Sequence, residues 1–188
     1  MHPAEHRALR ELHVFARQLA RHWDRLGGRM AGEAGPLLTA GAADAAALVR
    51  ELGAAAAQRG VHGEPAAALA GRFASARPSS PDRLLERNQA LRYALLDVQH
   101  CVTLLGYAAG LAATRGDEPL REICARWQER LTGHEAAVRA AVLALAGRPD
   151  EAIAPADPSP AGRLGQRIAA GAGALGEWVD GRAARRRR

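Results

Sequence analysis

The chain has 188 residues, 48% of them apolar, and a net charge of +6 at pH 7. This length suits one domain with a core, while the scarcity of β-branched and aromatic residues and the absence of two-residue alternation exclude a protein built mainly of strands. All 26 basic residues are arginine, which fits a GC-rich genome. Five of the positive charges lie in the last seven residues, at Arg182, Arg185, Arg186, Arg187 and Arg188.

The first half of the chain shows two helical patterns. Apolar residues recur at three- and four-residue steps over 3–26 and again over 37–58, and glycines follow both segments. These patterns predict an antiparallel hairpin. The stretch 60–80 has Gly, Pro and Ser at both ends and only a short apolar patch. We expect it to be a long crossover that carries the chain to the other end of the molecule.

A second and longer pair of helices is predicted over 81–115 and 117–146, with a tight turn at Gly116 between them. The fold class that follows is all-α. We expect an antiparallel four-helix bundle made of two hairpins joined by the long crossover, together with a C-terminal accessory helix.

The domain organisation follows from the composition of the last forty or so residues. The bundle is expected to occupy 1–147, and 148–160, rich in Pro, Asp and Ala, to form a linker. The segment 161–188 is expected to be an amphipathic helix, weakened by glycines, that ends in the basic tail.

The two cysteines and the lack of targeting segments indicate a cellular compartment. Cys101 and Cys124 fall inside helical patterns and are expected to be small core residues, with a redox pair as the alternative. The N-terminus has no secretory pattern, and no uninterrupted apolar run reaches about 20 residues. A cytoplasmic protein without a transmembrane segment is therefore expected.

Two polar residues fall on apolar helix faces at matching levels. A rotation of about 100° per residue places Asp97 and His134 on the apolar stripes of the second pair of helices, at similar distances from Gly116. We expect the two side chains to lie side by side. Three interpretations stay open: a structural hydrogen bond, a metal site in which His100 and Glu135 take part from the margins, or a register that leaves Asp97 in solvent.

Carboxylates and histidines on the first two helices are less promising. Glu11 and Glu51 lie roughly 100° from their apolar stripes and are expected to face solvent. The histidines of the first helix point in different directions, which argues against a hemerythrin-like site; they are His2, His6, His13 and His22.

Two hairpins with a long crossover, the run Asp97-Val98-Gln99-His100, and a last helix carrying His134-Glu135 before Gly147-Arg148-Pro149 resemble the ferritin-like superfamily. The likeness is to its small stress-associated bacterial members and covers about 3–150. The family's di-metal site takes carboxylates from two helices and Glu-x-x-His from two others. Here Val138 follows Glu135 where a histidine is required, so the resemblance implies a degenerate site.

The leading functional prediction is a ferritin-like protein without catalytic residues that works through homo-oligomerisation or contact with a protein partner. One alternative is a metal-dependent oxidoreductase or storage protein that holds a single transition-metal ion, iron first, on Asp97, His100, His134 and Glu135. Another is an adaptor whose arginine tail makes nonspecific contact with nucleic acid or anionic lipid. The usual behaviour of a short terminal charge run is simple solvation.

Overall fold

The computed structural model describes residues 2–61 and 84–168, and all regular elements within them are helices. This confirms the predicted all-α class. The four long helices are α1 (Pro3–Gly27), α2 (Ala34–Gln58), α4 (Arg87–Thr114) and α5 (Glu118–Ala144). The short 3₁₀ helix η2 (Leu145–Gly147) and helix α6 (Pro149–Ala152) follow α5, and 160–168 is also helical.

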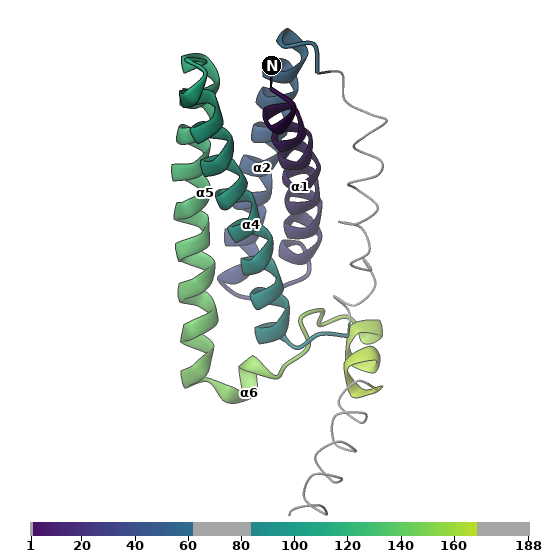
Figure 1. Ribbon diagram of the computed structural model, residues 1–188. Helices are drawn as coiled ribbons and strands as arrows, with labels where there is room; N and C mark the ends of the chain where they lie inside the picture. The colour runs from purple at the N-terminus through teal and green to yellow at the C-terminus, as the bar shows by residue number, and fades with distance from the viewer. Residues whose placement is uncertain (1, 62–83, 169–188) are drawn as a thin grey trace, which may run out of the picture.

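The long helices contact one another in a closed order. Helix α1 packs against α2 and α4, and α5 packs against α4 and α2 (Figure 1). The turn between α4 and α5 contains Gly116, whose φ of 69° is accessible to glycine at little cost. Helix α2 ends at the end of the molecule opposite the one where α4 begins (Figure 1). The predicted crossover between them lies outside the described residues from position 62 onward.

The start of α4 differs from the prediction, which placed it at 81. Glu86 caps the helix in a reciprocal arrangement with Gln89. Just before it, the backbone is tied to a distant segment: the Arg87 N–H donates to the Ala154 carbonyl at 2.8 Å, and the Ala156 N–H donates to the Leu85 carbonyl at 3.0 Å. These two hydrogen bonds occupy the Arg87 N–H and the Leu85 carbonyl, which would bond within the helix if it began at 81.

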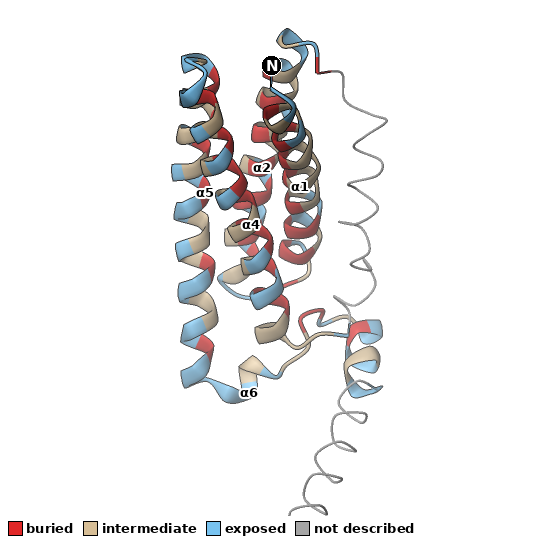
Figure 2. Ribbon diagram, in the orientation of Figure 1, coloured by how far each residue is buried: buried red, intermediate tan, exposed pale blue. Residues whose placement is uncertain are grey.

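The inner faces of all four long helices are buried (Figure 2). Leucines supply most of the large side chains that have no exposed surface, including Leu12, Leu19, Leu38, Leu48, Leu105, Leu120 and Leu131. Cys101 and Cys124 are also fully buried, as predicted for core residues. Burial raises the pKa of the Cys101 thiol to about 12 and that of Cys124 to about 11, so both thiols are protonated at neutral pH.

The segment expected to be a linker, 148–160, is instead attached to the start of α4. It contains α6, whose Glu151 accepts a hydrogen bond from Arg87 at 2.5 Å, and it buries Ala156 to 1% exposure. The backbone hydrogen bonds with Leu85 and Arg87 and the ion pair between Arg87 and Glu151 join this segment to the start of α4. In the helix that follows, Leu164 and Ile168 are exposed.

One described helix, α4, is long and apolar enough to cross a membrane by length and composition alone. Core helices of soluble proteins meet the same condition, and α4 lies between α1 and α5.

Candidate functional site

Asp97 lies on α4 with only 8% of its surface exposed, which confirms the predicted burial. Its partner, however, is His22 of α1, whose Nδ1 lies 2.5 Å from the Asp97 Oδ2. The predicted pairing of Asp97 with His134 is therefore wrong. Because His22 was set aside among the scattered histidines of the first helix, the sequence argument missed the residue that meets this carboxylate.

His134 of α5 binds a different carboxylate, on α2. Its Nε2 lies 2.7 Å from the Asp44 Oδ2, and the Arg130 Nε donates to the same oxygen at 2.8 Å. Burial alone would raise the pKa of Asp44, but the hydrogen bonds from Arg130 and His134 outweigh it and hold the pKa below its usual value. Asp44 is thus ionised at neutral pH and joins α2 to α5.

The indole of Trp23, the residue after His22, contacts α4 and α5. Its Nε1–H donates to the Ala94 carbonyl of α4 at 3.2 Å, and its ring meets the His134 ring edge-on, with centroids 6.2 Å apart. All four long helices therefore contribute a side chain to this set of contacts. We call this set the polar layer; it comprises His22, Trp23, Asp44, Asp97 and His134.

The erroneous pairing has a geometric cause. Counting from Gly116 gives the level of a residue along its helix, and the rotation gives its direction relative to the apolar stripe of that helix, but neither shows which neighbouring helix the side chain faces. At this level, Gln99 is the α4 residue that faces α5, and its Nε2 donates to Glu135 at 3.2 Å. Asp97 lies two residues earlier, about 200° away around the helix, and so faces α1.

The remaining predicted metal ligands occupy separate places. His100 stacks edge-on against Phe15 of α1, and its Nε2 lies 3.8 Å from the Glu11 carboxylate. Glu135 accepts from Gln99 and also from Arg139, the latter at 2.6 Å. The structure therefore brings the four predicted ligands, Asp97, His100, His134 and Glu135, to four different contacts.

This arrangement does not fit the metal centre that the ferritin-like resemblance implies. Within residues 2–61 and 84–168, no three His, Cys, Asp or Glu side chains gather in a way that could hold an ion. In the polar layer, each of the two pairs could offer a metal ion one imidazole nitrogen and one carboxylate oxygen. In both pairs these two atoms are hydrogen-bonded to each other. The predicted polyanion-binding arginines, from Arg182 onward, lie outside the described residues.

Two further polar contacts join α2 to α5. Glu51 accepts from the Trp127 Nε1–H at 2.7 Å and also pairs with Arg126. Arg59, beyond the C-terminal end of α2, binds Asp117 through two hydrogen bonds of 2.7 Å each. Glu51, which was expected to face solvent, is 35% exposed and is held by partners on α5. Hydrogen bonding from Arg126, and then from Trp127, lowers the pKa of Glu51 although burial opposes it.

Together with the contact of Asp44 with His134 and Arg130, the contacts of Glu51 and Arg59 form what we call the α2–α5 seam. Its α2 side is formed by Asp44, Glu51 and Arg59, which recur about every two helical turns. That spacing was visible in the sequence. It was missed because only apolar residues were used to define the faces of the helices.

The outer side of α5 carries a shallow groove formed by that helix alone. Its lining residues are Thr132, Glu135, Ala136, Arg139, Ala140 and Leu143. Leu143 is 66% exposed, and on α4 the side chain of Leu96 is 48% exposed. We call the lining set the α5 groove.

Comparisons with known proteins do not assign the chain to a family. No family model matches it, and no curated protein is significantly similar to it. Its function is therefore inferred from the arrangement of its own residues.

Proposed function

We propose that this chain is a ferritin-like, antiparallel four-helix bundle protein without catalytic activity, and that it works by associating with a second copy of itself through the α5 groove. Three observations support the bundle architecture: the closed order of helix contacts, the short connections within each hairpin, and the position of the α2 end opposite the α4 start. A long crossover between hairpins is the connection that ferritin-like bundles use.

The observation that carries the proposal is the α5 groove with its exposed leucine, Leu143, which is 66% exposed. The lining positions follow the three- and four-residue steps of one helix face, so a two-fold axis through their midpoint would place 132 opposite 143, 135 opposite 140, and 136 opposite 139. Two copies related by a two-fold axis through this point would present the same surface to each other, as a closed dimer requires. Exposed Leu143 would then cover the small side chain of the partner's Thr132, while Ala136 and Ala140 allow the helices to approach closely.

Charge on the groove is also self-complementary. Within one chain the Arg139 guanidinium binds Glu135 at 2.6 Å, and 49% of the arginine side chain is exposed. In the two-fold arrangement Arg139 lies opposite the partner's Ala136, one residue from the partner's Glu135 and within reach of it, and the reverse contact occurs by symmetry. Such pairs fix the register of an interface more than they strengthen it.

The polar layer supports a structural role for the interior. His22 with Asp97 joins α1 to α4, and His134 with Asp44 joins α5 to α2. Hydrogen bonds to a charged group contribute about 1.5 to 3 kcal/mol each, and a pairing that requires specific partners favours one arrangement of helices over others. Holding four helices in one arrangement is a function that these contacts perform without any substrate.

Sedimentation velocity of the purified full chain tests the proposal. We expect a dimer at micromolar concentration, and the single substitution Leu143→Glu should shift it to a monomer that keeps its helical circular dichroism. Leu164→Glu is the matched control, since Leu164 is also a leucine of similar exposure, 61% against 66%. A monomeric wild-type chain would overturn the proposal, and so would a dimer that only the Leu164 variant disrupts.

The rival role, binding of a single transition-metal ion, is tested separately. Metal analysis of the purified chain with and without added Fe(II) should find well below one equivalent if the polar layer is structural. Retention of a full equivalent that is lost in His134→Ala would favour the metal-binding role instead.

A further inference from the structure

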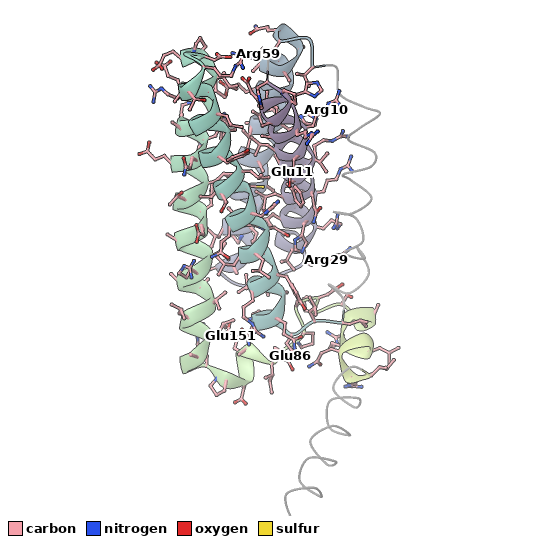
Figure 3. All side chains as sticks on the ribbon, in the orientation of Figure 1. Arg10, Glu11, Arg29, Arg59, Glu86 and Glu151 are labelled. Atoms are coloured by element: carbon pink, nitrogen blue, oxygen red, sulfur yellow. The ribbon has the colours of Figure 1, made fainter. Side chains whose placement is uncertain are left out.

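The face of α1 opposite its buried side carries a row of arginines, of which Arg7 and Arg21 are exposed and the others are partly buried. The buried face of this helix is centred near Leu12 and Trp23. At about 100° per residue, five arginines fall within roughly 40° of the opposite direction. They are Arg7, Arg10, Arg17, Arg21 and Arg25. Figure 3 labels Arg10 on the side of the molecule away from α5. We call these five residues the arginine row.

The arginine row gathers arginines without carboxylate partners along one helix. Eight other described arginines are bound to carboxylates: Arg59, Arg87, Arg115, Arg121, Arg126, Arg130, Arg139 and Arg148. The remaining described arginines, such as Arg50 and Arg92, lack an ion pair in the described part of the chain but are spread over other elements. Within the described residues, no member of the row forms an ion pair.

The carboxylates of α1 do not neutralise the row. Glu5 is buried beside Arg115, and Glu11 lies beside His100. Asp24 is exposed and stands at the margin, about 60° from the centre of the row. His13, next to the row, has a pKa below its usual value because of burial and, secondarily, the charge of Arg17. Within residues 2–61 and 84–168, the positive charge of the row is therefore not paired with a carboxylate.

We propose that the arginine row binds the phosphodiester backbone of nucleic acid. It extends about 27 Å along a rigid helix, at 1.5 Å per residue, with successive charges separated by one or two turns. Guanidinium groups bind phosphate oxygens in a bidentate manner, and an array of unpaired ones gains affinity by displacing counterions from a polyanion.

The structure favours nucleic acid over a membrane as the source of phosphate. A helix that lies on a bilayer buries its apolar face in the lipid. The apolar face of α1 is committed to the protein core, where Leu12, Leu19 and Trp23 have no exposed surface. On this face of α1, the only apolar residue between the arginines of the row is Val14, which is half-buried. Such a surface can bind charge but has little to insert into lipid.

The test compares two variants of the full chain that lose the same charge. The first is Arg7→Gln with Arg17→Gln and Arg21→Gln, which leaves the more buried Arg10 and Arg25 in place. The second is Arg50→Gln with Arg92→Gln and Arg163→Gln, three arginines on other elements that also lack an ion pair in the described residues. Circular dichroism and thermal unfolding confirm that each variant folds.

Fluorescence anisotropy with a labelled 20-base-pair DNA duplex, measured from 50 to 200 mM salt, gives the affinity and its salt dependence. We expect the row variant to bind at least tenfold more weakly than wild type, and its plot of log affinity against log salt to be shallower by about 2 to 3, since each phosphate contact contributes about 0.9. The control variant should stay within about threefold of wild type.

Three results would overturn the proposal. Equal losses in the two variants would show that net charge alone is responsible. Unchanged binding in the row variant would place the contact elsewhere, including in the C-terminal arginines. Row-dependent binding to vesicles containing phosphatidylserine, without row-dependent binding to DNA, would make a membrane the partner.

Discussion

At the scale of single residues, Gly41 of α2 leaves room for the indole of Trp23. A Cβ atom added at Gly41 of α2 would lie 2.2 Å from the Trp23 ring, well inside van der Waals contact. Glycine in a helix interior costs about 1 kcal/mol relative to alanine. Its presence here is explained by the space that the indole needs in order to reach the Ala94 carbonyl.

Gly41→Ala should therefore destabilise the protein by about 1 to 3 kcal/mol, because overpacking outweighs the gain in helix propensity. Gly53→Ala is the control in the same helix, since the nearest atom to an added Cβ there is 3.9 Å away. That change should raise stability by about 0.5 to 1 kcal/mol. Urea denaturation measures both, and a Gly41 variant as stable as the Gly53 variant would contradict the packing described.

Asp44 should make stability depend on pH. Its folded pKa is lowered, so its contribution is complete above the unfolded value of about 3.9 and is lost as pH falls through the folded pKa. Asp44→Asn should cost about 1 to 3 kcal/mol at pH 7, and the difference from wild type should shrink below about pH 4. Urea denaturation at a series of pH values checks this.

Asp150→Asn, at an exposed position beyond α5, is the control and should change stability by less than about 0.5 kcal/mol at either pH. A difference between wild type and Asp44→Asn that grows on acidification would reverse the expected sign and refute the assignment of Asp44 as the stabilising carboxylate.

The sequence predicted which polar and sulfur-containing residues are buried better than it predicted which residues they contact. The apolar surroundings of Asp97 in the sequence were sufficient to predict that it is inside, and the same holds for Cys101 and Cys124. The partners His22 and Asp44 were not predicted, because each comes from a helix far away in sequence. A helical pattern gives the direction of a side chain only relative to its own helix.

At the scale of elements, the two contacts between hairpins differ in character. Where α1 meets α4, apolar residues dominate and the polar layer adds His22 with Asp97. Along the α2–α5 seam, three polar contacts recur about every two turns, at Asp44, Glu51 and Arg59. Hydrogen bonds with specific partners determine how α2 and α5 are aligned.

Glu51→Ala should lower the free energy of unfolding by about 1 to 3 kcal/mol, because it removes the acceptor of the Trp127 indole N–H and Trp127 is only 7% exposed. Glu11→Ala removes a carboxylate that is 45% exposed and should change stability by about 0.5 kcal/mol or less. Chemical denaturation of the two variants side by side decides the matter. Small and equal losses would mean that Glu51 contributes nothing to the seam.

The helices themselves were largely predictable, and their ends less so. Periodic apolar residues located α1, α2, α4 and α5, while the expected start of the third long helix at 81 preceded the observed start at Arg87. The true start depends on hydrogen bonds with Ala154 and Ala156, some seventy residues away. Local sequence signals carry no information about such pairings.

At the scale of the whole molecule, the chain presents two unlike surfaces on different helices. The arginine row on α1 is positive and without ion pairs in the described residues, whereas the α5 groove combines exposed Leu143 with a Glu135–Arg139 pair. A dimer formed through α5 would leave α1 of each copy free. The proposed self-association and the proposed contact with nucleic acid are therefore compatible.

The most direct test of self-association is a charge swap across the α5 groove. Glu135→Arg alone places arginines within reach of the partner's Arg139, and Arg139→Glu alone places glutamates within reach of the partner's Glu135. Each variant should sediment as a monomer, because like charges meet twice in the two-fold interface. Mixed in equal amounts, the two variants should form a heterodimer in which both pairs have opposite signs. Mixtures that remain monomeric, or single variants that dimerise as well as wild type, would contradict the account.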